Sequence, residues 1–364
     1  MTLSFAARPP ALVCGIPIAD ATMAEAIDII ADLIERGRSL RRSHQVATVN
    51  VDFLVKAIRD PSILSLLQHA DLSLADGTPV VWAARALGTP LPERVAGADL
   101  VPALAERAST TGWRIHLYGS EPGTAERAAE LLTERHPGVA ITGDSGGLIK
   151  DVTKVDDAII DSIREREPDI LCVALGNPKQ EKFIEANRAR LKTPVMIGVG
   201  GTLDMLVGSK RRAPLWVQKS GLEWVVRLAQ EPRRLLGRYA LDAWVFPRSV
   251  ARQVYLSRRA GSNSRPIIDA QPHEVVITAR RNVGAPSADY ATAISFIEAG
   301  AALRVDVADG GSLRLADLSA MVGMIRHAIL VDVPVRIGPV GTTLQQQCES
   351  FAVDAFLSRV ARIG

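Results

Sequence analysis

The sequence of 364 residues has few cysteines, few aromatic residues and no long hydrophobic run. Its three cysteines, Cys14, Cys172 and Cys348, are odd in number and far apart, so we expect neither a disulfide framework nor a zinc site. No apolar stretch approaches the ~20 residues that a membrane-spanning helix needs. The segment Met1–Pro10 lacks the apolar core of a signal peptide. These absences favour a cytoplasmic protein without a spanning helix.

The charge is small overall but unevenly distributed. A net charge of +3 argues against a general nucleic-acid-binding protein. Residues 210–265, however, hold 13 Lys or Arg residues against three acidic ones, and Trp216, Trp224 and Trp244 are interleaved among the cations. One interpretation is a pair of helices with a solvated basic face. The other, which the density of arginine and tryptophan favours, is a basic amphipathic element at a membrane surface.

Residues 11–209 alternate short apolar runs with amphipathic segments. The predicted strands are Gln45–Val49, Leu72–Ala75, Arg114–Tyr118, Ala140–Gly143, Ile170–Leu175 and Val195–Val199. The predicted helices are Met23–Arg36, Val51–Arg59, Pro61–His69, Pro79–Leu87, Ala98–Ala108, Gly123–Arg135, Val155–Arg166 and Gln180–Arg190. Short strands alternating with helices indicate βαβ units, so we predict a Rossmann-like α/β core with a largely parallel sheet. The absence of Gly-x-Gly-x-x-Gly argues against a nicotinamide enzyme.

The pattern changes twice after this core. Residues 210–256 are the basic amphipathic appendage, and residues 257–273 are rich in small, polar and helix-breaking residues, which predicts a linker. Residues 274–364 predict a second, small α/β domain. Its predicted strands are Glu274–Ala279, Leu303–Val307 and Val335–Ile337, and its predicted helices are Ala288–Ala299, Leu315–Ala328 and Thr342–Phe356.

The segment Gly176-Asn177-Pro178-Lys179-Gln180-Glu181 follows a buried-strand pattern and opens a predicted helix. Ligands bind at the carboxyl ends of strands in open α/β sheets, so this turn is a candidate site, although an ordinary connection has the same pattern. Further short motifs accompany it in a fixed order: Thr48-Val49-Asn50, Ala75-Asp76-Gly77, Glu93–Gly97, Leu117–Ser120, Gly198–Asp204, Arg212-Ala213-Pro214, Gly221–Trp224, Arg227–Arg234 and Arg238-Tyr239. From about residue 12 to about residue 247, this series resembles the WecG/TagA/CpsF family of bacterial glycosyltransferases, glycosyltransferase family 26.

The resemblance implies an inverting, metal-independent glycosyltransferase without a cofactor. The implied donor is a UDP-sugar of the N-acetylmannosamine, N-acetylmannosaminuronic acid or glucuronic acid type. The implied acceptor is a polyprenyl-diphosphate-linked saccharide for a cell-surface polysaccharide, at the inner face of the bacterial cell membrane. No Asp-x-Asp sequence occurs, so we expect arginines and backbone N–H groups, not a metal ion, to stabilise the diphosphate.

Asp76 is the candidate catalytic base. It ends a predicted strand before Gly77, so its carboxylate can face the crevice, although an Asp-Gly turn or a helix cap would look the same. The resemblance assigns it the role of base. Thr48 and Asn50 match the family's Thr-x-Asn and are expected to contact the sugar and orient the acceptor. Alternatively, Thr48 is an ordinary strand residue and Asn50 is a helix cap.

The other candidates are substrate-binding residues at strand ends. Gly119 and Ser120 end a predicted strand and precede a helix, which suits contact with a phosphate or a ribose. By resemblance, Gln180 and Glu181 contact the nucleotide sugar, and Asp204 lies at the edge of the site. Asp204 could equally cap a helix.

Four arginines are candidate site residues. Arg94 lies in a predicted loop, where a fixed guanidinium could meet two phosphate oxygens at once, although it could also be a surface residue. By resemblance, Arg227, Arg234 and Arg238 complete the active site and help the basic segment to reach the membrane. Their spacing would place them on one face of a continuous helix, which Pro232 could interrupt.

The C-terminal pattern resembles the STAS fold. Where phosphorylated members carry Asp-Ser-Ser-Gly-Leu, this chain has Arg314–Leu318 without a hydroxyl at the usual place, so we expect an accessory partner-binding module and no phosphoswitch. Deletion of residues 266–364 is expected to leave catalysis largely intact. Two alternatives to the transferase stay open: a non-catalytic scaffold that carries this module, and a nucleotide-sugar epimerase. The joint presence of the candidate site residues argues against the first, and the basic segment against the second.

Overall fold

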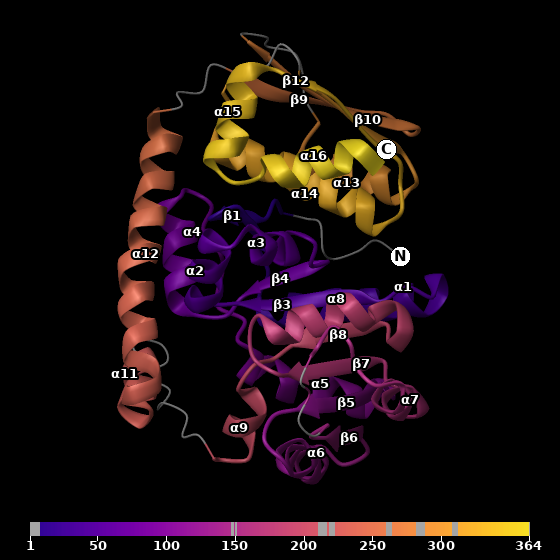
Figure 1. The fold of residues 1–364 in the computed structure, drawn as a ribbon. Helices are drawn as coiled ribbons and strands as arrows, with labels where there is room; N and C mark the ends of the chain where they lie inside the picture. The colour runs from indigo at the N-terminus through magenta and orange to yellow at the C-terminus, as the bar shows by residue number, and fades with distance from the viewer. Residues whose placement is uncertain are drawn as a thin grey trace.

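The computed structural model describes residues 8–146, 149, 151–209, 217, 223–259, 264–281, 288–307 and 312–363. At its centre is a six-stranded sheet in the order β4-β3-β8-β7-β5-β6, in which every neighbouring pair is parallel (Figure 1). Its strands are β3 (His44–Val49), β4 (Leu72–Ala75), β5 (Arg114–Gly119), β6 (Ala140–Asp144), β7 (Ile170–Ala174) and β8 (Val195–Gly198). The predicted parallel sheet is confirmed, and it fits a Rossmann-like core.

Helices cover both faces of this sheet, because neighbouring residues of a strand point to opposite faces. Ile170 and Cys172 of β7 pack with α1 (Met23–Leu40), α5 (Gly97–Thr111) and α6 (Thr124–Arg135). Leu171 and Val173 pack on the other face with α7 (Asp157–Glu165) and α8 (Lys179–Leu191). Burial on both faces explains why these strands read as continuous apolar runs.

The connections around the sheet create a crevice at one edge. The chain leaves β5 through α6 towards β6, whereas it leaves β7, the neighbour of β5, through α8 in the opposite direction towards β8. At such a switch point the loops after the two strands part, and ligands of open α/β sheets bind there. Ser120 directly follows β5, and Gly176 lies two residues after the end of β7.

Three shorter helices flank the end of β3 and β4. They are α2 (Val51–Arg59), α3 (Pro61–Gln68) and α4 (Thr78–Ala86), and a fourth, α9 (Thr202–Leu206), follows β8. Asn50 caps α2 by accepting from the N–H of Phe53 at 3.0 Å, and Asp60 caps α3. Each cap satisfies an N–H that has no partner inside its helix.

Two further helices form one side of the molecule. They are α11 (Glu223–Gln230) and α12 (Pro232–Arg259), and α12 runs along both α/β units (Figure 1). Pro232 begins α12, as its fixed φ and missing N–H favour. Arg227 therefore lies on a different helix from Arg234 and Arg238. The expectation of one continuous helix is wrong, and the predicted interruption at Pro232 is confirmed.

A second sheet lies near the C-terminus, in the order β12-β11-β10-β9. Its elements are β9 (Ser264–Ala270), β10 (Glu274–Arg281), α13 (Tyr290–Glu298), β11 (Ala302–Val307), α14 (Leu315–Leu330), β12 (Val335–Val340), α15 (Thr342–Ser350) and α16 (Asp354–Ile363). β9 pairs antiparallel with β10. The predicted linker at 257–273 is thus corrected, because α12 extends to Arg259 and 264–270 form a paired strand.

The sequence did not predict a small hairpin of β1 (Ala11–Val13) and β2 (Ile16–Ile18). Its two-residue turn has positive φ at both positions, +50° at Cys14 and +81° at Gly15, as in the type I′ turn that suits hairpins. A Cβ on Gly15 would lie 2.9 Å from the carbonyl oxygens of Phe351 and Ala352. The turn therefore touches the loop between α15 and α16 closely enough to require glycine.

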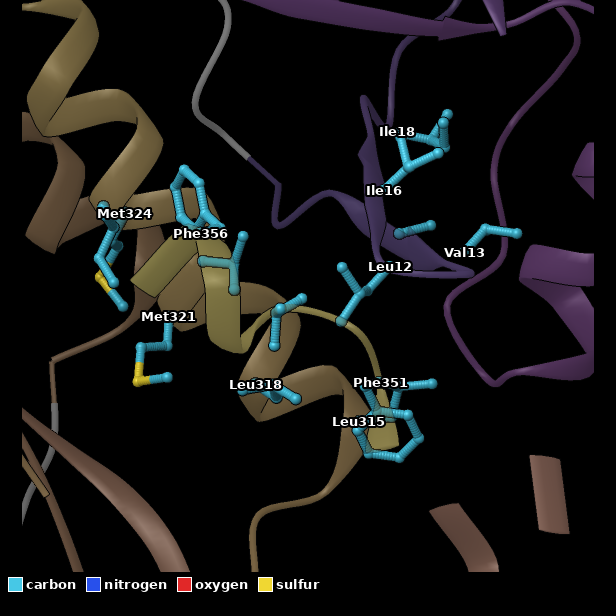
Figure 2. Close-up of a cluster of buried hydrophobic side chains, with 14 of the residues drawn as sticks. Leu12, Val13, Ile16, Ile18, Leu315, Leu318, Met321, Met324, Phe351 and Phe356 are labelled. Atoms are coloured by element: carbon cyan, nitrogen blue, oxygen red, sulfur yellow. The ribbon is translucent and has the colours of Figure 1, made fainter. Parts of the chain in front are cut away.

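The hairpin joins the two α/β units in one hydrophobic core. Leu12, Val13, Ile16 and Ile18 are fully buried, and they belong to the same cluster as the apolar side chains of α14 and α16. Figure 2 shows Leu12 pointing from the hairpin towards the C-terminal domain, in which Leu315, Leu318, Met321, Met324, Phe351 and Phe356 are drawn, whereas Val13 points away from it. This shared core argues against the expectation that the C-terminal domain can be removed without consequence.

Candidate functional site

A cavity of about 300 Å³ lies between the strand ends of the six-stranded sheet and the helices α11 and α12. One wall comes from α2, α4 and the loops after β3 and β4, and the other comes from α11 and α12. The lining residues are Asn50, Val51, Asp52, Asp76, Gly77, Thr78, Pro79, Arg94, Glu223, Trp224, Arg227, Arg238, Tyr239, Asp242, Ala243, Phe246 and Pro247. Five of the predicted site residues meet here: Asn50, Asp76, Arg94, Arg227 and Arg238.

Asp76 lies at the carboxyl end of β4, where backbone geometry fixes its position. Its N–H donates to the carbonyl oxygen of Val49 at 2.9 Å, which extends the β3–β4 pairing by one residue, and Gly77 turns the chain away with φ +139°. Burial raises the pKa of the Asp76 carboxyl, while Arg227 and Arg94 oppose the increase and Glu223 and Asp99 add to it. A carboxylate with a raised pKa is a stronger base.

Glu223 connects the two walls next to Asp76. Its carboxylate forms ion pairs with Arg94 at 2.9 Å and with Arg227 at 2.9 Å. Although burial acts to raise it, the two guanidinium groups hold the pKa of Glu223 below its usual value. In the sequence, Glu223 stands out only as part of the motif Gly221–Trp224. Its role is visible only in the fold, which brings Arg94 within reach.

A second charged group lies further along the cavity. Asp52 pairs with Lys56 at 2.8 Å and with Arg238 at 3.6 Å. Lys56 also donates to the carbonyl oxygen of Asn177 at 3.1 Å and contacts its side chain. Burial, reinforced by Asp52, raises the pKa of Asp242 to about 6, against the pull of Arg238 and Lys56. Sequence reasoning missed Asp52, Lys56 and Asp242, and only the i, i+4 spacing of Asp52 and Lys56 hinted at a pair.

Thr48 and Asn50 have structural partners in addition to any ligand. The Thr48 hydroxyl is buried and donates to the carbonyl oxygen of Gly198 at 2.9 Å, so it fastens β3 to β8. Asn50 caps α2 and also lines the cavity. The structure therefore supports the cap interpretation of Asn50 without removing it from the site, and it places Thr48 outside the lining of the cavity.

Ser120 and Asp204 meet at the crevice between β5 and β7. The Ser120 hydroxyl donates to Asp204 Oδ1 at 2.6 Å, and both residues follow strand ends. Gly119 has φ +98°, and a Cβ there would lie 2.9 Å from Leu175 Cδ2. These residues form a strand-end group that does not line the cavity around Asp76.

Gln180 and Glu181 complete this strand-end group, but both side chains are buried. Gln180 donates to Glu181 Oε1 at 2.7 Å and accepts from the N–H of Gly200 at 2.9 Å. Among the described residues, Glu181 Oε2 has no hydrogen-bond partner, and burial raises the pKa of Glu181 to about 7. A Cβ on Gly198 would lie 2.5 Å from Gln180 Nε2, so this pair packs tightly under the strand ends. For Gln180 and Glu181 to contact the nucleotide sugar as predicted, these buried side chains would have to move.

Arg234 was predicted to share the site, but its side chain lies outside the described residues. Within the described ranges, no group of three or more His, Cys, Asp or Glu side chains is arranged to hold a metal ion. Nor does any helix in the described part of the chain have the length and apolar character needed to cross a membrane.

Comparison with known proteins identifies relatives of the region that contains the cavity. Residues 11–260 match the model of the glycosyl transferase WecG/TagA/CpsF family. A Bacillus spizizenii protein named N-acetylglucosaminyldiphosphoundecaprenol N-acetyl-beta-D-mannosaminyltransferase is 35% identical over 189 residues, which is 52% of this chain and 72% of that protein. Proteins of the same name from Bacillus subtilis and Staphylococcus aureus MW2 are 34% and 30% identical over 189 and 190 residues, or 72% and 73% of their lengths.

Proposed function

Because the chain belongs to the WecG/TagA/CpsF family of glycosyltransferases, we propose that it transfers a sugar from a UDP-sugar to a polyprenyl-diphosphate-linked saccharide, with inversion and without a metal ion. The observation that carries the proposal is the half-buried carboxylate of Asp76 in a cavity that Arg94, Arg227 and Arg238 also line. A base and three guanidinium groups in one cavity are what sugar transfer from a diphosphate requires.

Asp76 acts as the general base in this proposal. It accepts the proton of the attacking acceptor hydroxyl as that oxygen bonds to the anomeric carbon of the donor. The bond from that carbon to the diphosphate oxygen breaks on the opposite side, which inverts the configuration. The raised pKa of Asp76 increases its affinity for the proton of the acceptor hydroxyl. The carboxyl group must be ionised before the reaction begins.

The leaving diphosphate is stabilised by arginines. In the structure the carboxylate of Glu223 lies between the guanidinium groups of Arg94 and Arg227, so an anion already occupies that position. We propose that a diphosphate oxygen takes the place of Glu223 during the reaction. Two guanidinium groups can spread the developing charge over several charge-assisted hydrogen bonds.

The names of the relatives support an N-acetylmannosaminyl group as the transferred sugar and an N-acetylglucosaminyl-diphosphate lipid as the acceptor. We propose that UDP carries the sugar, with the corresponding uronic acid and glucuronic acid as donor alternatives. We place the nucleotide above the strand-end group of Gly119, Ser120, Gln180, Glu181 and Asp204, because the crevice between β5 and β7 opens there.

The outer face of α11 and α12 suits the membrane surface on which such an acceptor lies. The large apolar side chains exposed on these helices are Trp224, Val225, Leu236, Leu241, Trp244 and Tyr255, of which Trp224 also lines the cavity. Arg248 stacks on the ring of Trp244 with 3.0 Å between its Cζ and the ring centroid. Aromatic and cationic side chains on one exposed helix face are typical of peripheral binding at the inner face of the cell membrane. Arg227 and Arg238 line the cavity, and we propose that they bind the substrate there.

The small C-terminal α/β domain is consistent with the proposed STAS-like fold and with a protein partner. The position where phosphorylated members carry a hydroxyl is the start of α14, and here Arg314 pairs with Asp317 at 2.8 Å. This pair offers no acceptor for a phosphoryl group, so our proposal includes no phosphoswitch.

The test is a UDP-release assay with UDP-N-acetylmannosamine and an N-acetylglucosaminyl-diphosphate lipid with a short chain. We expect release only when both are present, and at the same rate with EDTA. Loss of release with EDTA contradicts the metal-free mechanism. UDP or epimerised sugar formed without acceptor favours the epimerase alternative, and no turnover with any donor favours the scaffold.

A further inference from the structure

The long helix α12 has two different environments along its length. Its first half lines the cavity through Arg238, Tyr239, Asp242, Ala243 and Phe246. Its second half lies away from the cavity and packs into the core that the hairpin shares with the C-terminal domain, through side chains that include Val250, Val254 and Leu256. Figure 1 shows α12 running past both units. The position of the cavity wall therefore depends on what holds the second half.

The side chain of Gln253 forms polar contacts that hold the second half of α12. Its side chain is only 5% exposed. Its Nε2 donates to the carbonyl oxygen of Leu12 at 2.8 Å, and its Oε1 accepts from the N–H of Cys14 at 2.9 Å. One side chain thus satisfies both a donor and an acceptor of β1 and its turn, more than 230 residues earlier in the chain. Loss of a buried partner leaves such groups unpaired, which is costly.

The C-terminal domain in turn fixes the hairpin. Gln68 donates both to the carbonyl oxygen of Gly15 at 2.9 Å and to that of Ala352 at 2.7 Å, which ties the turn to the loop before α16. Arg326 of α14 is half-buried and donates to the carbonyl oxygen of Pro17 at 2.9 Å. Figure 2 shows the apolar side of the same contact, with Leu12 pointing towards the helices of the domain.

We propose that Gln253 is a positioning residue for the active site and that the C-terminal domain, acting through the β1–β2 hairpin, is its support. The domain, the hairpin and Gln253 form a continuous series of contacts that ends at the cavity wall. This series keeps Arg238, Tyr239 and Asp242 opposite Asp76. The C-terminal domain thereby acquires a role in transfer, although none of its described residues lines the cavity. The catalytic part of this inference rests on the proposed function.

The test compares Gln253→Ala and Gln253→Met in the full chain. Methionine keeps the volume of the side chain but forms neither hydrogen bond, so it separates the bonds from the packing. Gln345→Ala is the matched control, because Gln345 is exposed on α15 and its side chain donates to Glu349 on the same helix. Amide hydrogen exchange of residues 235–247 measures how often this part of α12 opens. UDP release with the soluble acceptor measures catalysis.

We expect both Gln253 variants to increase exchange in residues 235–247 about tenfold, while exchange in the six-stranded sheet stays unchanged. The kcat/KM for the acceptor should fall by a similar factor, about 1.4 kcal/mol at 25 °C. Unchanged exchange in that segment, or increased exchange with unchanged kcat/KM, overturns the proposal. An equal increase throughout the six-stranded sheet also overturns it, because Gln253 would then stabilise the fold as a whole.

The hydrogen-exchange and UDP-release measurements also distinguish a failure of this inference from a failure of the proposed function. If the wild-type protein transfers no sugar with any donor, the proposed function fails. The exchange data alone then decide whether Gln253 holds α12. If transfer occurs and only the exchange result is negative, the proposed function stands and the positioning role is withdrawn.

Discussion

The two walls of the cavity are built in different ways. The wall that carries Asp76 belongs to the parallel sheet, where backbone hydrogen bonds such as that from Asp76 to Val49 fix the base. The opposite wall consists of α11 and α12, which reach Asp76 through the ion pairs of Glu223 and are held at the far end by Gln253. The comparison teaches that the base is positioned by local backbone geometry, whereas the cations depend on contacts distant in sequence.

Removal of residues 264–364 breaks the support of the helical wall and should have the largest effect. It would uncover the side of the hairpin that carries Leu12, which is now fully buried and points towards the helices of the domain. Each large apolar side chain contributes about 1.5–3 kcal/mol when buried, and a typical domain has only about 5–15 kcal/mol of total stability. We expect an insoluble or partly unfolded fragment by soluble yield and thermal unfolding. A soluble fragment with wild-type turnover would restore the view of an independent accessory domain.

Asp76→Asn tests the wall formed by the sheet. The substitution preserves shape but removes the ability to accept a proton, so turnover should fall about 10²–10⁴-fold with little change in UDP affinity. In the wild type, kcat/KM should decrease as the pH falls through the pKa of Asp76, which lies above the usual aspartate value. Steady-state UDP release across pH measures both effects. An Asn variant with near wild-type turnover excludes Asp76 as the base.

Trp244→Ala tests the outer face of the helical wall. Trp244 is 64% exposed, so its replacement should leave the fold and the cavity intact. If the ring enters the lipid interface, binding to anionic vesicles should weaken about ten- to hundredfold, the range expected for one large apolar side chain. Trp113→Phe is a suitable control, since Trp113 is buried in the sheet core far from α12. Equal vesicle binding by Trp244→Ala and wild type argues against this membrane face.

Glu181→Gln gives the smallest effect and concerns the strand-end group. Burial raises the pKa of Glu181 to about 7 in the folded state, whereas its ordinary value is 4.5. Between these values the folded protein binds a proton that the unfolded chain lacks. The free energy of unfolding should therefore decrease as pH rises, by about 1.4 kcal/mol per pH unit. Denaturant unfolding at several pH values should show this slope in the wild type and a flatter one in the variant. Parallel slopes would show that Glu181 ionises in the folded protein as it does in water.

The local elements were largely predictable from the sequence. The strand Leu72–Ala75 and the helix Val51–Arg59 have the predicted bounds, and Pro232 begins a new helix. Apolar runs, caps and prolines act over a few residues, so their effects can be recognised without a fold. The hairpin was missed because two strands of three residues carry too little pattern.

The candidate site could be predicted only in part. Asp76 and Arg94 lie in local motifs, and both line the cavity. The partners of Glu223, Ser120 and Gln253 are separated from them by 129, 84 and 239 residues, and no local pattern indicates such pairs. The burial of Gln180 and Glu181, which are expected to contact the nucleotide sugar, could not be predicted, because burial depends on what packs against a residue.

The sequence by itself determined the family, the parallel α/β core and the residues at its strand ends, because motifs and periodicity are local properties of the chain. The tertiary structure decided which of those residues share a cavity, and it added Glu223, Asp52 and Asp242 to the set. It also decided that the C-terminal domain shares a hydrophobic core with the hairpin and α12. These outcomes depend on packing between segments far apart in the sequence, and the free energy of such contacts exists only once the whole chain has folded.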